Sequence, residues 1–222
     1  MYRNKAVLRD VVEDLTFEKI TNWNEFDIFE VAAATDRGVL FPTLFEVLFN
    51  MNGFNVIRTL NVERSVRVCS CVFIFSSFIF FSSNQVLHET LSQAERSYSN
   101  TMLSDVSKNP YHNALHGADV MFSSAAIFSS LSETHVPSEA FSSLVIFSLG
   151  IASLLHDYKH LGVNNGFLKN FKHPLSIRFQ NGAYLERMHA AEALKLIKST
   201  SLLDTFTEQN KSAFEFLVTS LI

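Results

Sequence analysis

The stretch IFSLGIASLLHDYKHLGVNNGF, residues 146–167, joins an uncharged apolar run to a cluster of polar side chains that can bind metals. Apolar residues three and four apart over 146–155 predict a buried helix that ends near His156. His156 and Asp157 then offer one nitrogen and one oxygen ligand, and His160 follows close behind. A carboxylate can bind two cations, because each of its oxygens can take one. The alternative is an ordinary helix end, with both imidazoles interacting with the dipole and Asp157 capping the turn.

A second histidine pair lies in NPYHNALHGADV, residues 109–120. His112 and His116 are four residues apart, so both rings project from one face if a helix opens at Pro110. Such a pair alone is more typical of a solvated or structural position than of a metal site. Two such motifs, each flanked by apolar helix, are less easily explained by chance. Together they predict one shared site, where nitrogen ligands favour zinc and oxygen ligands favour magnesium or manganese.

The rest of the chain predicts an all-α fold. Its 222 residues include only 7 Gly and 4 Pro, and apolar residues recur at helical spacing over long segments. No alternating strand pattern competes with this interpretation. Turns are expected at 52–53, 109–110, 136–137, 164–166 and 173–174. The expected helices are 24–34, 41–51, 86–98, 113–131, 138–155, 183–198 and 208–222.

Composition narrows the class of partner. Hydrophobic residues make up 47% of the chain and its formal net charge is −4, so there is no basic stripe of the kind that binds nucleic acids. The two cysteines, Cys69 and Cys71, are too close in sequence to indicate a disulfide framework. No secretory signal is visible at residues 1–14. These features favour a cytoplasmic protein acting on a small molecule.

One segment departs from the helical pattern. Residues 68–87 carry no charge, and 72–81 reads VFIFSSFIFF. A membrane span is one interpretation, but five serines interrupt the run, so the sequence gives no firm evidence for the membrane. A buried helix or a pair of strands is the second. The third is a retained intron over 66–85, because a pyrimidine-rich tract encodes Phe and Ser; sequencing the mature transcript across these codons tests it.

The two histidine motifs resemble those of class I cyclic-nucleotide phosphodiesterases. Residues 112–120 resemble the family motif HNxxHAxDV, with Gly117 in the usual alanine position. Residues 156–167 resemble HDxxHxGxxNxF at every fixed position. Lys159 and Leu161 stand where many members have Asp and Pro, which changes the charge beside the metal ligands rather than the ligands themselves.

Weaker matches extend the resemblance. FDIF at 26–29 and LERMH at 185–189 are similar to family sequences, the second to LENHH. The resemblance therefore predicts a partial catalytic domain over 23–222, preceded by an extension at 1–22, with 66–85 as an atypical insertion. The fold that it implies is the all-helical HD-type metallohydrolase domain.

The resemblance also implies roles for individual residues. His116, His156 and Asp157 would bind two divalent metal ions, zinc with magnesium or manganese. His112 would protonate the leaving 3′ oxygen, and Glu186 is a candidate to keep it protonated. The residues that would orient the ligands and the attacking water, or stand beside the site, are Tyr111, Asn113, His160, Asn165, Glu186 and His189.

The activity implied is hydrolysis of cyclic AMP, cyclic GMP or both to 5′-nucleoside monophosphates, in signal transduction. Family members carry a fourth metal-binding Asp and a base-binding Gln and Phe on later helices, so the domain is expected to be incomplete at its C-terminus. Two alternatives stay open: a catalytically inactive remnant, and another HD-type nucleotide phosphohydrolase. The sequence predicts no oligomeric state.

Overall fold

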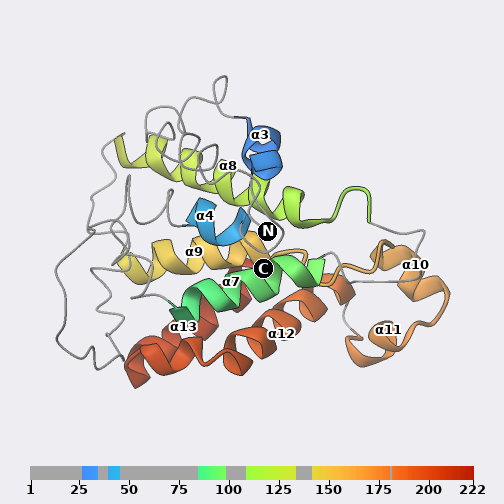
Figure 1. The fold of residues 1–222 in the computed structure, drawn as a ribbon. Coiled ribbons are helices and arrows are strands. Elements are labelled where there is room, and N and C mark those ends of the chain that lie inside the picture. Colours follow the sequence, from blue (N-terminus) through green and yellow to red (C-terminus); the bar gives the residue numbers. More distant parts are fainter. Residues whose placement is uncertain (1–26, 35–39, 46–84, 99–108, 134–141, 181) are drawn as a thin grey trace, which may run out of the picture.

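Helices form all of the regular secondary structure in the part of the chain that the structure describes (Figure 1). The structure is a computed structural model, and it describes residues 27–34, 40–45, 85–98, 109–133, 142–180 and 182–222. The predicted all-α class is confirmed. The described elements are α3 (Ile28–Ala34), α4 (Leu40–Phe45), α7 (Gln85–Tyr98), α8 (Ala114–Glu133), α9 (Ser143–Leu155), α10 (Asn165–Asn170), α11 (Pro174–Arg178), α12 (Tyr184–Ser199), the 3-10 turn η3 (Leu202–Thr205) and α13 (Glu208–Leu221).

Helix α9 lies at the centre of the bundle, packed against α8 on one side and α13 on the other (Figure 1). It carries no charged residue, and nine of its residues are buried, as expected for a helix with neighbours around it. Phenylalanines fill much of the surrounding core. Phe147 of α9 meets Phe45 and Phe214 with ring centroids 5.5 Å apart in each pair. Burial of these rings supplies a large hydrophobic contribution to stability.

A second, smaller core joins α10 and α11 to the start of α12. Leu168 of α10 is fully buried there against Tyr184, Leu185 and Met188 of α12. This core holds α10 and α11, the segment that follows His160, at the side of the bundle, at the right of Figure 1.

The predicted helices occur, with shifted ends. Helix α9 begins at Ser143 rather than at residue 138, because the Ser142 hydroxyl caps it and accepts a hydrogen bond from the Val145 N–H. Helix α8 begins at Ala114, one residue after the predicted start at 113, so Pro110 and His112 lie in the bend before it. Asn113 caps it, its Oδ1 accepting from two backbone N–H groups of the first turn. Parts of three predicted helices lie outside the described residues: 24–26 of the helix at 24–34, 46–51 of the helix at 41–51, and 138–141 of the helix at 138–155.

The turn predicted at 164–166 is also wrong in part. Asn164 caps α10 by accepting a hydrogen bond from the Phe167 N–H at 2.8 Å, and the helix starts at Asn165. Neither α10 nor α11 was predicted, because helices of five or six residues are too short to show a hydrophobic period. The turn at 173–174 is confirmed as the point where His173 caps α11 ahead of Pro174.

Several sequence predictions concern residues outside the described ranges: the extension 1–22, the turns at 52–53 and 136–137, and the insertion 66–85 except its last residue, Gln85, which begins α7. They stay predictions. Among the described helices, none combines the length and the hydropathy that a bilayer-spanning segment needs.

Candidate metal centre

The predicted metal ligands come together where two central helices meet. His116 lies in the first turn of α8, and His156 and Asp157 follow the last residue of α9. The Nε2 atoms of His116 and His156 are 3.2 Å apart, and the Asp157 Oδ2 lies 3.3 Å and 3.1 Å from them. Residues forty positions apart in sequence thus present three Lewis-basic atoms to one point.

The hydrogen bonding of His156 shows why this arrangement suits a cation. Its Nδ1 lies 2.8 Å from the Ser153 carbonyl oxygen, which can only accept, so Nδ1 carries the proton. The lone pair of a neutral His156 is therefore on Nε2, facing His116 and Asp157. Three electron-rich atoms this close repel one another unless a proton or a metal ion lies among them. Two imidazole nitrogens and a carboxylate are a common zinc donor set, so the residues present fit a divalent metal.

Asp157 is ionised in this surrounding. Partial burial acts to raise its pKa, but the hydrogen bond that a protonated His156 donates from Nε2 and the nearby imidazoles outweigh that effect and lower it to about 2. The carboxylate is consequently available as a ligand across the physiological pH range. Its second oxygen, Oδ1, faces the Nε2 of His189 at 3.7 Å.

His112 stands beside this cluster, in the bend that precedes α8 rather than on the helix. Its Nε2 lies 3.9 Å from the Asp157 Oδ2, and its backbone N–H donates to the Asn109 Oδ1 at 3.1 Å. Its ring stacks on that of His160, with centroids 3.7 Å apart and planes 9° from parallel. The exposed Tyr111 ring covers His116 from outside, at 4.4 Å between centroids. His112 is thus held at the rim of the site without belonging to the His116, His156 and Asp157 set.

His160 contributes a fixed N–H group. Its Nδ1 accepts a hydrogen bond from the Gly162 N–H at 3.0 Å, and Gly162 reaches this position with a left-handed φ of 76°. The proton of neutral His160 is therefore on Nε2. Burial and the neighbouring His112 lower the pKa of His160 to about 4, which keeps the ring neutral. His112, Asp157 and His160 are also close enough to share an ion, but neither nitrogen of His160 is left with a free lone pair.

His189 of α12 closes the inner side of the site. Its Nδ1 donates to the Tyr158 carbonyl oxygen at 2.7 Å, and burial lowers its pKa. Its Nε2 is buried without a hydrogen-bond partner among the described residues. A buried acceptor left in this state is costly unless a further group occupies the site. This orphaned atom, pointing toward Asp157, is a second sign that the cluster holds a ligand.

Asn165 and Glu186 tie α10 to the start of α12. The Asn165 amide donates to both carboxylate oxygens of Glu186, at 2.9 Å and 3.1 Å, and its Oδ1 accepts from the Leu185 N–H. Glu186 was expected to support His112, but in the structure its hydrogen-bond partner is Asn165. Asn113, also expected beside the site, acts as the cap of α8.

Two contributors were missed. Asn109 holds both the His112 backbone and the His160 ring, the latter at 3.4 Å from its amide. An Asn before a proline gives no sign of that role in the sequence. Lys159, noted only as a departure from the family pattern, adopts a left-handed φ of 60° and bonds Glu192 of α12 at 2.8 Å. It links the loop that carries Asp157 to α12.

The fold and this His/Asp cluster define an all-helical domain with a candidate metal centre, and comparisons identify the family. The sequence profile of the 3'5'-cyclic nucleotide phosphodiesterase family matches residues 111–222. The chain therefore belongs to the cyclic-nucleotide phosphodiesterase family.

Individual relatives agree with this assignment. The chain is 28% identical over 200 residues to the human high affinity cAMP-specific and IBMX-insensitive 3',5'-cyclic phosphodiesterase 8A, covering 89% of this chain and 20% of that protein. It is 25% identical over 187 residues to 3',5'-cyclic-AMP phosphodiesterase 4 of Dictyostelium discoideum, covering 82% and 14%. The chain thus spans a fifth or less of the length of these two relatives.

A solved structure shares the fold. The phosphodiesterase domain of the RhoPDE fusion protein from the choanoflagellate Salpingoeca rosetta superposes with a TM-score of 0.64. The match covers 94% of this chain and 53% of that domain chain, at 19% identity. The expected phosphodiesterase-type fold is confirmed.

Proposed function

We propose that this protein hydrolyses the 3′,5′-cyclic phosphate of cyclic AMP to give 5′-AMP, using divalent metal ions. The observation that carries the proposal is the convergence of His116, His156 and Asp157 on one point, with His112 at its rim. The names of the relatives, which are cyclic-AMP phosphodiesterases, support cyclic AMP ahead of cyclic GMP.

Zinc is the ion that we assign to the nitrogen-rich position, held by His116, His156 and one oxygen of Asp157. The second Asp157 oxygen is available to a magnesium or manganese ion. Such ions, when bound, polarise a phosphate ester and make water a stronger nucleophile near neutral pH. The protein's part is to hold the donors in place before substrate arrives.

His112 is the residue that we assign as general acid. It stands 3.9 Å from Asp157, close enough to reach a phosphate held at the cluster, and its ring is partly exposed to solvent. As an imidazolium it would donate a proton to the 3′ oxygen as the P–O3′ bond breaks, so that the sugar leaves as a neutral hydroxyl.

The neighbouring histidines have complementary roles in this proposal. His160 presents its Nε2–H toward the site and is a donor to a phosphate oxygen or to water. His189 presents a bare, buried Nε2 and is an acceptor for a proton of the attacking water. Their opposite polarities follow from the backbone groups that each ring bonds at its Nδ1.

The test is product analysis with the whole chain supplied with zinc and magnesium or manganese. Cyclic AMP, cyclic GMP, AMP and ATP are each incubated with the protein and with its Asp157→Ala variant. We expect 5′-AMP from cyclic AMP, and none with the variant or with a chelator. Turnover of AMP or ATP without any cyclic nucleotide would instead indicate a different nucleotide phosphohydrolase. Metal binding without any turnover would indicate a binding remnant.

A further inference from the structure

Helices α10 and α11 form a small lobe, residues 164–180, at one end of the molecule (Figure 1). The inner side of this lobe is already filled. Leu168 is fully buried, and Leu175 and Phe179 pack against the same small core. Apolar side chains that remain outside this core are therefore not needed to fill it.

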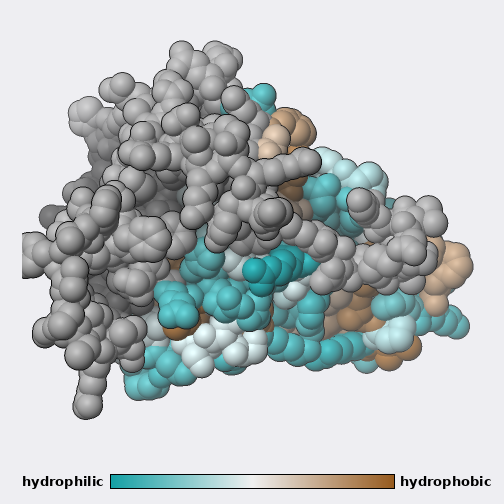
Figure 2. Space-filling view, in the orientation of Figure 1, coloured by the Kyte–Doolittle hydropathy of each residue, from teal (hydrophilic) through white to brown (hydrophobic). Residues whose placement is uncertain are grey.

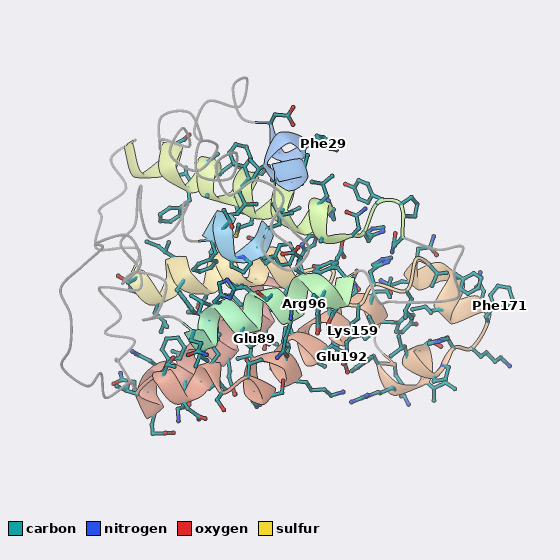
Figure 3. The ribbon with its side chains drawn as sticks, in the orientation of Figure 1. Phe29, Glu89, Arg96, Lys159, Phe171 and Glu192 are labelled. Carbon is teal, nitrogen blue, oxygen red and sulfur yellow. The ribbon has the colours of Figure 1, made fainter. Side chains whose placement is uncertain are left out.

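Three large apolar side chains lie outside the core. Phe171 is 71% exposed, Ile177 63% and Phe167 44%. The rings of Phe167 and Phe171 stack on each other with centroids 4.3 Å apart. Phe171 points away from the rest of the molecule at the far end of the lobe (Figure 3). A grouped set of exposed apolar residues marks an interaction surface more often than isolated ones do.

The same lobe is positively charged. Between residues 164 and 180 there are Lys169, Lys172 and Arg178, and no Asp or Glu, although the whole chain has a net charge of −4. None of the three cations forms an ion pair with a carboxylate of the described residues. The Arg178 guanidinium lies over the Phe179 ring. Figure 2 shows apolar (tan and brown) and polar (teal) residues side by side over this end of the molecule.

We propose that the α10–α11 lobe docks the protein on the surface of an anionic lipid bilayer. The phenyl rings of Phe167 and Phe171 enter the boundary between headgroups and acyl chains, and the ammonium groups of Lys169 and Lys172 stay with the anionic headgroups. Phenyl rings and ammonium groups alternate along one short segment. A membrane interface accommodates both, because it offers apolar acyl chains next to anionic headgroups. An acidic peptide would account for the cations and leave the rings in water.

Docking through this lobe would also orient the metal centre. Asn165, in the first turn of α10, is bonded to Glu186 and to the start of α12, the helix that carries His189. The lobe is therefore fixed to the same helix as the inner side of the site. A protein bound in this way would meet its substrate next to the membrane.

Vesicle sedimentation tests the proposal, with the whole chain and phosphatidylcholine vesicles with or without phosphatidylserine. We expect binding only to the phosphatidylserine vesicles, weakened by added salt. The double variant Lys169→Gln, Lys172→Gln should bind about twenty-five-fold more weakly, about fivefold for each lysine. Phe171→Ser should independently cost about tenfold through lost apolar burial.

Matched controls lie on the other helices. Phe216 of α13 is 70% exposed, and Lys198 of α12 pairs with Glu215, so Phe216→Ser and Lys198→Gln should leave vesicle binding unchanged. Far-UV circular dichroism of each variant checks that the helices form. Equal binding to neutral vesicles, no binding, or an equal loss with the control variants would overturn the proposal. Binding to a poly-glutamate peptide without binding to vesicles would overturn it in favour of an acidic protein partner.

Discussion

Asp157 is the residue through which the parts of the site are connected. One of its oxygens faces His116 and His156, and the other faces His189. Each of these histidines comes from a different helix or helix end, so loss of the carboxylate would leave imidazoles with no common anion. His112, by contrast, touches the cluster only from its rim.

This difference predicts separate effects of two substitutions. His112→Ala should lower kcat by about 10²–10⁴-fold, the usual contribution of a general acid, while zinc still binds. Asp157→Ala should lose both turnover and zinc. Isothermal titration with zinc, run beside the cyclic-AMP assay, measures the two properties. Equal loss of zinc in both variants would mean that His112 is a ligand instead.

Glu192 gives a prediction about stability and pH. Partial burial acts to raise its pKa, but hydrogen bonds from Lys159 and Lys195 lower it below the ordinary 4.5. A carboxyl group whose pKa is lowered by folding stabilises the folded state at pH values above its ordinary pKa. This stabilisation is lost as the pH falls through the lowered pKa. Glu192→Gln should therefore cost about 0.5 kcal/mol near pH 7, because its partners Lys159 and Lys195 are solvent-exposed and water screens both ion pairs. As the pH falls below 4.5 and through the lowered pKa, the difference between the two proteins should shrink to nothing.

Urea unfolding of both proteins at a series of pH values measures this difference. The difference in unfolding free energy between the two proteins cancels the titration of all other groups, because both proteins contain them. A difference that persists unchanged at low pH would show that Glu192 acts through packing rather than through its charge.

At the scale of elements, the close approach of α8 to α9 sets the distance between the two histidine motifs. Gly117 is the contact point: a Cβ there would lie 3.1 Å from the Phe41 ring and 3.2 Å from the Leu154 carbonyl oxygen. That carbonyl also accepts a hydrogen bond from Tyr98, so it cannot easily move. His116 precedes this glycine directly, so the spacing of the helices controls its distance to His156.

Gly117→Val should therefore destabilise the protein by about 1–3 kcal/mol, the usual cost of overpacking a filled core, and should weaken zinc binding. Denaturant unfolding and zinc titration measure the two effects. Asp119→Val, at an exposed position two residues along α8, is the control for the lower helix propensity of valine. If both variants lose the same stability, the contact at Gly117 is not tight.

The elements that the sequence predicted best are those with a long hydrophobic period. The existence of α9 and α13 followed from apolar spacing, whereas their starts depended on single capping hydroxyls, at Ser142 and Thr207. Helices α10 and α11 were not predicted, because one or two turns of helix are too short to show a hydrophobic period in the sequence. His112 would share a helix face with His116 only if a helix opened at Pro110, and that condition is not met because Asn113 caps α8.

At the scale of the whole molecule, the metal centre should couple to folding. Its donors join the start of α8 to the end of α9, and His189 of α12 faces Asp157 with a buried acceptor left unsatisfied. Zinc at about 100 times its Kd should add about 2.7 kcal/mol to the free energy of unfolding. A thermal unfolding series with zinc and with a chelator measures this. His116→Ala should remove the effect; an unchanged response in that variant would place the ion elsewhere.

The sequence motifs predicted which residues gather at the site, and the structure brings most of them together. They could not predict how each imidazole is oriented, because that depends on backbone groups contacted only in the folded chain. Gly162 N–H fixes the proton of His160, and the Tyr158 carbonyl fixes that of His189. The pairing of Glu186 with Asn165 likewise arises from the unpredicted helix α10.

We propose that His116, His156 and Asp157 form a metal centre. Anomalous X-ray diffraction at the zinc edge, from crystals of the whole chain grown with zinc, tests it most directly. We expect an anomalous peak about 2.0–2.2 Å from the Nε2 atoms of both histidines and from a carboxylate oxygen of Asp157. A zinc peak at other residues, with none among these three, would contradict it.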